Sequence, residues 1–153
     1  MDKFDTIIAE HPLFEGLDEK HLHLLAGCAS NVVFKPGEFV AHEGDPADTF
    51  YLVRHGKVTV ETFAPGRGPV TIDTVIEGEV MGWSWMAEPY TVHFDARALE
   101  LTRCIKIDAV CLRKKLEEDH DLGFVIMKRF IQLVLRRLHN TRLQLLDWYG
   151  NDK

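Results

Sequence analysis

Short apolar runs alternate with turn residues between Val33 and Ile107, and this pattern restricts the fold more than any other feature of the chain. Side chains of a strand point alternately to opposite faces, so apolar residues at every second position indicate half-buried strands. The turns fall at Pro36-Gly37, Gly44-Asp45-Pro46, His55-Gly56 and residues 65–69. Short strands with turns about every ten residues indicate a barrel or sandwich. We therefore expect an antiparallel β-roll, of the double-stranded β-helix or jelly-roll type, over about residues 30–107.

Helical patterns flank this β region on both sides. Asp18 is a suitable N-cap for a helix before the first strand. From Asp108 the pattern is helical again, and we expect C-terminal helices over residues 109–149, the second of them capped by Asp121. No glycine or proline interrupts residues 124–149, so the last helix is about 40 Å long. The predicted class is α+β, with N-terminal helices and a long C-terminal dimerisation helix.

The last helix has the most regular apolar pattern in the chain. Eight positions, separated alternately by three and four residues, form a heptad seam: Phe124, Met127, Ile131, Val134, Leu138, Thr141, Leu145 and Trp148. A second apolar set, Ile126, Phe130 and Leu133, lies on a neighbouring face. Either the roll covers both faces, or it covers one and the other needs a partner. A parallel helix from a second copy is the simplest partner, so we expect a homodimer through the seam.

Length and composition indicate one folded domain over residues 1–153. Hydrophobic residues make up 46% and charged residues 27%, which is typical of a globular chain and not of a disordered one. The net charge of −6 does not favour general attraction to nucleic acid. The first ten residues lack a signal pattern, and no apolar run is long enough for a membrane span. We therefore expect a cytoplasmic protein with no membrane contact.

The reactive side chains do not predict an enzyme or a metal protein. The three cysteines, Cys28, Cys104 and Cys111, have no CxxC spacing, and we expect them to be buried reduced thiols. They are too few to hold an iron–sulfur cluster. His21 and His23 do not share a helix face, so no metal site is expected. His93 alone does not indicate haem, and no Ser/His/Asp or Cys/His arrangement predicts catalysis.

Several glycine motifs resemble those of cyclic nucleotide-binding domains, which occur in Crp–Fnr bacterial regulators and in kinase regulatory subunits. The motifs are residues 34–38, 44–48, 50–53 and 56–58, and residues 12–17 look like the N-terminal segment of the bacterial branch. The resemblance covers roughly residues 12–147. It implies a ligand pocket inside the roll, dimerisation through the last helix and regulatory signalling by movement of that helix against the roll.

The resemblance also implies where a ligand binds. The family holds the cyclic phosphate in a cassette that reads Gly-Glu-(Leu/Ile)-(Gly/Ala), a short helix, a loop and Arg-(Ser/Thr)-Ala. Backbone N–H groups and the arginine hold the phosphate, and the glutamate accepts from the ribose hydroxyl. Gly82 matches the cassette glycine, but Trp83 stands at the glutamate and Trp85 at the small residue, on either side of Ser84.

The second half of the cassette also departs from the family pattern. Counting back from Arg97-Ala98, Val92 falls on the arginine and His93 on the Ser/Thr. On the last helix, Thr141 falls on the position that contacts the base in the catabolite-activator branch, and Arg142 replaces the small polar residue beside it. A phosphate that lacks its cation loses about 3–5 kcal/mol. We therefore expect cyclic AMP and cyclic GMP to bind poorly or not at all.

Two interpretations of the tryptophan pair remain open. In the first, Trp83 and Trp85 fill the pocket and make a ligand-independent core. In the second, an indole stacks on a planar or apolar ligand, and His93 and the Ser84 backbone supply polar groups. Arg97 is a candidate anion partner. A strand expected over residues 92–99 puts His93, Asp95 and Arg97 on one face, so a surface pair of Arg97 with Asp95 is equally open.

The functional expectation is a non-catalytic sensor that acts through a small ligand or a protein partner, with no cofactor identified. A genuine cyclic nucleotide receptor with an unusual cassette and a ligand-free structural dimer are the alternatives. Regulators of the family read DNA with a helix-turn-helix of about 60–80 residues after the long helix. The sequence ends at Lys153, so we expect no direct DNA binding, although a DNA-binding protein could act with it.

Overall fold

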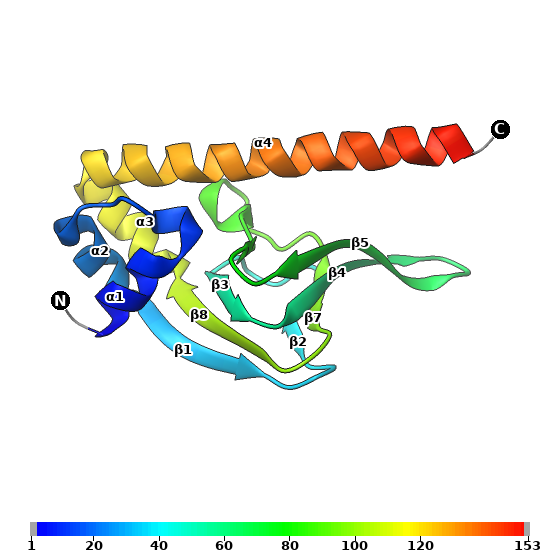
Figure 1. Ribbon diagram of the computed structural model, residues 1–153, viewed down its shortest axis with the longest axis horizontal. Helices are drawn as coiled ribbons and strands as arrows, with labels where there is room; N and C mark the ends of the chain where they lie inside the picture. Colours follow the sequence, from blue (N-terminus) through cyan, green and yellow to red (C-terminus); the bar gives the residue numbers. More distant parts are fainter. Residues whose placement is uncertain (1–2, 152–153) are drawn as a thin grey trace.

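Two antiparallel sheets of four strands each form a β-roll in the computed structural model, which describes residues 3–151 (Figure 1). The first sheet has the order β1 (Ala29–Phe34), β8 (Thr102–Asp108), β3 (Thr49–His55) and β6 (Val80–Met81). The second has the order β2 (Phe39–Ala41), β7 (Asp95–Ala98), β4 (Lys57–Ala64) and β5 (Gly68–Ile76). The predicted antiparallel roll with flanking helices is therefore confirmed.

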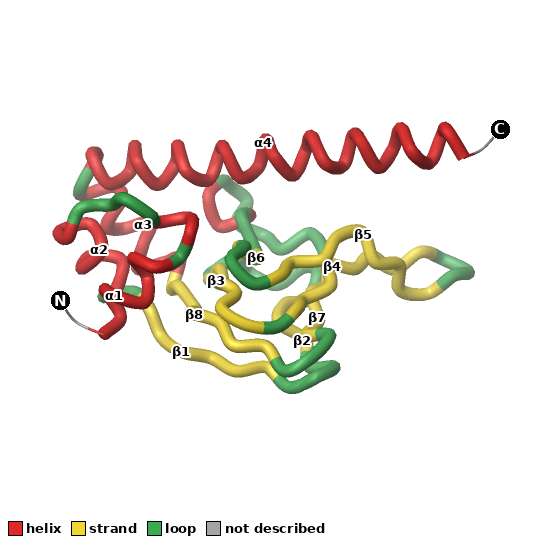
Figure 2. Tube along the Cα trace, viewed as in Figure 1, coloured by secondary structure: helices red, strands yellow, loops and turns green. Residues whose placement is uncertain are grey.

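The helices lie on one side of the roll and along its top (Figures 1 and 2). They are α1 (Lys3–Glu10), α2 (Glu19–Ala26), α3 (Ala109–Glu118) and α4 (His120–Asn151), with 3₁₀ turns η1 (Pro12–Phe14) and η2 (Ser84–Met86). With 32 residues, α4 is about 48 Å long and passes over both sheets toward the β4–β5 hairpin.

Carboxylate caps begin three of these helices. Asp18 accepts a hydrogen bond from the His21 N–H at 2.8 Å and starts α2, as predicted. Asp108 likewise accepts from the first turn of α3. The prediction of Asp121 as the α4 cap is wrong, because α4 begins at His120, two residues earlier than this cap implies, and Asp119 accepts from the Leu122 N–H at 3.1 Å. Asp119 has an extended backbone, which is the geometry of an N-cap residue.

A hydrophobic core joins the helices to the roll. Leu22 and Leu25 of α2 face it, and they belong to the same cluster as Ile126, Phe130 and Leu133 of α4. A second cluster lies inside the roll and consists of Val40, Tyr51, Val53, Val58, Val75, Met81, Ala96 and Cys104. The second apolar set of α4 therefore packs on this chain, whereas most side chains of the heptad seam are exposed.

The turn at Gly56 shows why glycine is needed between β3 and β4. Its φ is +103°, in the region that only glycine adopts readily. A Cβ at this position would lie 2.5 Å from Oγ1 of Thr102 and 2.6 Å from the carbonyl oxygen of Leu101. The glycine therefore allows the end of β3 to pass against the start of β8.

The cysteines differ from the expectation of three reduced thiols. Cys28, just after α2, and Cys111, in α3, form a disulfide with their Cα atoms 5.8 Å apart. The two cysteines are 83 positions apart and the whole roll lies between them, so the chain spacing gave no signal of this pairing. Cys104 is free and buried inside the roll, and burial raises its pKa to about 12. Only Cys104 therefore matches the prediction.

Buried His11 predicts a specific loss of stability in acid. Its Nδ1 accepts from the Leu13 N–H at 3.2 Å, which fixes the start of η1. Burial lowers the pKa of His11 from 6.5 to about 4. The Glu79 backbone opposes this shift only weakly, because Nε2 has no well-formed hydrogen bond to any atom of residues 3–151.

Between pH 6.5 and pH 4 the unfolded chain therefore binds more protons than the folded one at His11. The stabilisation is complete above pH 6.5 and falls by about 3 kcal/mol as the pH drops to 4. We expect urea unfolding at pH 7 and pH 4 to show this loss, and His11→Asn to reduce it. Asparagine keeps an acceptor for the Leu13 N–H but does not titrate. An identical pH dependence in both proteins would contradict the assignment.

Candidate ligand pocket

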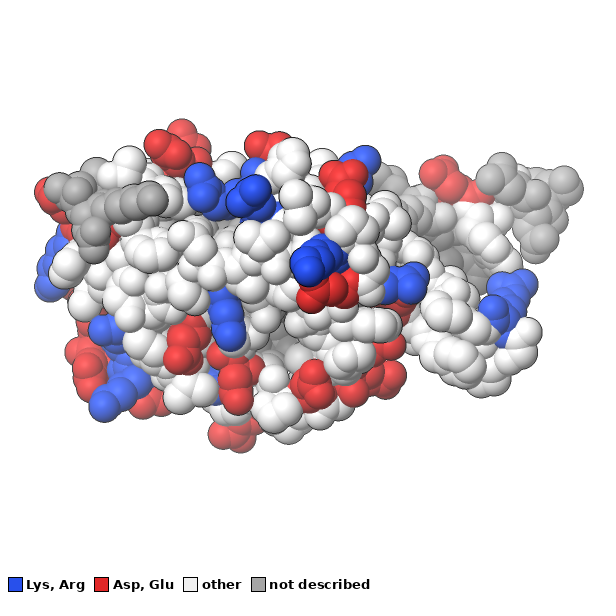
Figure 3. Space-filling view, turned by 90° about the horizontal axis from the view of Figure 1, so that it is seen from below, with Lys and Arg blue, Asp and Glu red and all other residues white. Residues whose placement is uncertain are grey.

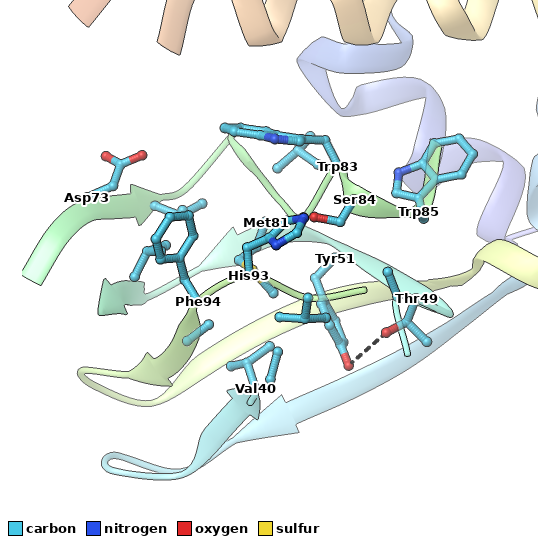
Figure 4. A pocket seen from close by; sticks show the side chains of 18 of the residues that line it. Val40, Thr49, Tyr51, Asp73, Met81, Trp83, Ser84, Trp85, His93 and Phe94 are labelled. Carbon is cyan, nitrogen blue, oxygen red and sulfur yellow. Dashed lines mark hydrogen bonds between the residues drawn. The ribbon is translucent and has the colours of Figure 1, made fainter. Parts of the chain in front are cut away.

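A cavity of about 750 Å³ opens inside the β-roll beneath α4. Its wall is mostly apolar, and Figure 4 shows part of it around Met81, Tyr51 and Phe94. Four residues of α4 border it: Val134, Arg137, Leu138 and Thr141. This volume is typical of pockets that take small molecules. The long helix therefore forms one side of a pocket whose other walls are strands.

The two tryptophans have different surroundings. The Trp85 side chain has no exposed surface, stacks on Phe50 with ring centroids 4.9 Å apart and meets the edge of Phe130 at 5.1 Å. It borders the cavity from behind and belongs to the core. Trp83 is 37% exposed and lies on the α4 side of the cavity (Figure 4). The interpretation in which both indoles fill the roll is therefore wrong, because the cavity remains beside them.

The cassette region forms only part of the family's phosphate cradle. Gly82 has φ +102°, so it makes the turn after β6 that glycine permits. The helix that follows is the single 3₁₀ turn η2, and the Trp83 side chain gives it no cap. Between Gly82 and His93 the chain carries no arginine or lysine. The family's positive charge is therefore missing from this wall of the pocket.

Seven of the nine ligand-site residues predicted from the sequence border the cavity: Gly82, Trp83, Ser84, Trp85, Val92, His93 and Thr141. Arg142 lies outside the lining and is exposed. The Thr141 hydroxyl donates to the Arg137 carbonyl oxygen at 2.9 Å, so its proton is already used within α4.

Arg97 also lies outside the cavity lining. It follows Ala96, which faces the cavity, and so points to the other side of β7. Its guanidinium pairs with Glu61 at 2.8 Å, and the predicted alternative partner, Asp95, instead accepts from the Glu43 N–H. The predicted strand over residues 92–99 is shortened to β7. His93 precedes that strand, so the expected shared face of His93, Asp95 and Arg97 is wrong.

Two cations on the pocket wall were missed by the sequence reasoning. Arg137 of α4 binds Asp73 of β5 at 2.7 Å and Glu79, before β6, at 3.0 Å, and its side chain is only 12% exposed. Lys106 of β8 borders the cavity from the opposite wall. In the predicted helix, Arg137 lies between two seam positions. Lys106 lies two residues after Cys104 and so shares its strand face, and this spacing was the only sequence signal that Lys106 faces the pocket.

Arg113 of α3 holds the cassette loop in place. It donates to the Trp85 carbonyl oxygen at 2.8 Å and to that of Ala47 at 3.3 Å. Its guanidinium carbon lies 4.2 Å from the centre of the Tyr90 ring. Charge-assisted bonds of this kind are about twice as strong as neutral ones. The loop around the pocket is therefore fixed to α3 and not only to its own strand neighbours.

Within residues 3–151, no group of three or more His, Cys, Asp or Glu side chains could hold a metal ion. Over the same range, none of the helices combines the length and the apolar character that a membrane crossing requires.

The two sheets, the glycine turns and the cavity beneath the last helix define a β-roll with an internal pocket. A family model described as the cyclic nucleotide-binding domain matches residues 31–119, more than half of the chain. The chain therefore belongs to the cyclic nucleotide-binding domain family.

Its relatives include bacterial regulators. A CRP-like cAMP-activated global transcriptional regulator of Mycobacterium tuberculosis is 24% identical over 148 residues, which cover 97% of this chain and 64% of the regulator. A solved structure from Geobacter metallireducens, named for cyclic nucleotide binding, is 27% identical with a TM-score of 0.78, over 91% of this chain and all of the other. A cyclic nucleotide-binding domain of Methylobacillus flagellatus has the same TM-score at 22% identity, over 94% of this chain and 80% of the other, and shows the fold alone.

Proposed function

We propose that this domain is a non-catalytic regulatory sensor whose pocket takes a small ligand other than a cyclic nucleotide bound in the family's usual way. The open apolar cavity supports the binding of a small ligand. The cavity lies against α4, and this position supports signalling through the helix, because a helix that contacts both a ligand and a partner changes position when either one binds. A protein partner that takes the signal from α4 is part of the same proposal.

One observation carries the exclusion of the usual cyclic nucleotide mode. The cassette wall from Gly82 to His93 offers a cyclic phosphate no cation, and Val92 stands where the family's arginine would be. Arg137 could replace it only by leaving Asp73 and Glu79, which already bind it. The loss of about 3–5 kcal/mol corresponds to two to four decades of affinity.

Calorimetry tests the exclusion directly. We expect titration with cyclic AMP or cyclic GMP to give no binding with a Kd in the micromolar range. The same sample should bind N-phenyl-1-naphthylamine, a neutral apolar probe, which shows that the pocket is open. A micromolar isotherm with either nucleotide would contradict the proposal and favour the genuine receptor with an unusual cassette. If neither the probe nor a nucleotide binds, the ligand-free structural dimer is the better account.

The exposed seam of α4 supports a homodimer. Phe124 is 69% and Ile131 is 55% exposed, although both are large apolar side chains. Val134, Leu138 and Thr141 belong to the seam and also border the cavity. A parallel helix of a second copy along the seam would therefore cover the mouth of the pocket, and ligand binding would be coupled to dimer geometry.

Direct DNA binding is not part of the proposal. Figure 3 shows Asp and Glu side chains interspersed with Lys and Arg on the face opposite α4, and the whole chain has a net charge of −6. Such a surface does not favour binding to the phosphate backbone of DNA. We propose a cytoplasmic location, as expected from the sequence, and no catalytic activity.

A further inference from the structure

We infer that the pocket selects an amphipathic anion, with an apolar or aromatic body and one carboxylate-like or sulfonate-like head group that binds Lys106. This inference rests on the proposed function and names the class of ligand. The head group would lie on the wall formed by β8 and β3, next to β6 and Met81, which precedes the cassette glycine. The site would therefore differ from the family's phosphate subsite in the residues that hold the anion.

The register of the sheet turns Lys106 toward the inside of the roll. Lys106 lies opposite Tyr51 of β3 in the antiparallel ladder. Cys104, two residues earlier on β8, is 2% exposed in the inner cluster, and residues two apart on a strand share a face. Both Tyr51 and Lys106 border the cavity. Lys106 therefore belongs to the pocket wall and not to the outer surface of the sheet.

Lys106 has no ionic partner among the residues that the structure describes. No carboxylate oxygen of residues 3–151 lies within 4.0 Å of its amine. Of the aspartates that border the cavity, Asp73 binds Arg137, Asp48 binds Arg113 at 3.6 Å, and Asp45 accepts from the His42 N–H. Lysine rarely faces an apolar interior unless it is paired. An anionic ligand would supply the missing partner.

Two hydroxyl groups add to the binding capacity of this wall. Oγ1 of Thr49 donates to the hydroxyl oxygen of Tyr51 at 3.4 Å, and Figure 4 shows the two side chains meeting below Met81 and His93. The Tyr51 O–H is then free to donate to a head group. An ammonium and a phenol on facing strand positions are donors to a compact oxyanion.

The rest of the pocket fits a hydrocarbon or aromatic body. Val60, Val75, Val80 and Met81 belong to the lining of the cavity. Trp83 lies on the α4 side (Figure 4). A volume of about 750 Å³ leaves room for two or three fused or linked rings. A ligand with its head at Lys106 would extend toward Trp83 and the seam residues of α4, where its body could affect the position of the helix.

A matched pair of fluorescent probes tests this inference. The anionic probe is 8-anilino-1-naphthalenesulfonate, and N-phenyl-1-naphthylamine has the same ring system without the sulfonate. We expect Lys106→Met to weaken the anionic probe about tenfold or more, the size of a lost charge-assisted bond, and to change the neutral probe less than twofold. Lys106→Arg should retain most of the affinity for the anionic probe.

Three controls separate the pocket from other effects. Arg103→Met removes an exposed cation from the same strand, on the face opposite Lys106, so it should leave both probes unchanged. Leu99→Ser alters an exposed apolar side chain outside both the cavity and the seam, so unchanged binding in this variant argues against binding of the probes to exposed apolar surface. Circular dichroism of each variant checks the fold, and if Lys106→Met does not fold, Lys106→Gln replaces it.

The outcomes distinguish the two proposals. If neither probe binds the unaltered protein, the open pocket and the proposed function both fail. If both probes bind with equal affinity and Lys106→Met or Lys106→Gln weakens neither, the anion site is overturned while the sensor proposal stands. Preferential loss of the anionic probe in the Lys106 variant, with Arg103→Met unaffected, supports the anion site.

Discussion

Replacing Trp85 with alanine is expected to lower the free energy of unfolding by about 3–5 kcal/mol, the usual cost of removing a fully buried large aromatic side chain. Trp85 joins Phe50 of β3 to Phe130 of α4, so its loss leaves a cavity where the roll and the long helix meet. Urea denaturation followed by far-ultraviolet circular dichroism measures the change.

Trp83→Ala is the matched control on the same turn. Because Trp83 is partly exposed and borders the open cavity, we expect its replacement to change the free energy of unfolding by less than about 1 kcal/mol. The same variant should weaken the neutral naphthylamine probe. Equal destabilisation by the two substitutions would contradict the division between a structural indole at Trp85 and a pocket indole at Trp83.

Placing a charge on the α4 seam is expected to convert a dimer into a monomer. Ile131→Asp would put one carboxylate from each copy into an apolar helix interface. At a cost of about 2 kcal/mol per buried polar group, two copies raise the dimer Kd about 1,000-fold. Sedimentation equilibrium across a range of protein concentrations measures this Kd.

Gln132→Asp provides the control for the seam. It adds the same charge one residue away, at an exposed position outside the heptad seam. We expect this variant to remain dimeric and Ile131→Asp to retain its circular dichroism spectrum, since Ile131 does not belong to the buried clusters of the chain. The homodimer proposal fails if the unaltered chain is a monomer at tens of micromolar, or if both variants dissociate equally.

Local chemistry explains which parts of the fold could be predicted. Proline and glycine dihedral preferences marked the turns, and the Gly56 turn is confirmed by its positive φ. Period-two alternation then located the strands, and the caps at Asp18 and Asp108 act within one helical turn. The Asp121 cap was wrong by two residues because Asp119 competes for the same role. Two nearby aspartates cannot be separated without backbone geometry.

Features that depend on tertiary contacts could not be predicted. The Cys28–Cys111 disulfide and the bonds of Arg137 to Asp73 and Glu79 join elements far apart in the chain. Trp83 and Trp85 are the same residue type, so the sequence does not distinguish them. Only in the folded chain does Phe130 pack against Trp85 and place that side chain in the core. Arg97 was placed near the pocket because the start of β7 was expected too early.

A crystal structure grown with millimolar cyclic AMP tests the central claim most directly. The account predicts a roll that stays open beneath α4, with no cyclic phosphate density against the backbone of residues 82–84 and with Arg137 still bound to Asp73 and Glu79. A cyclic phosphodiester seated at residues 82–84 and held by any side chain of the pocket would contradict it.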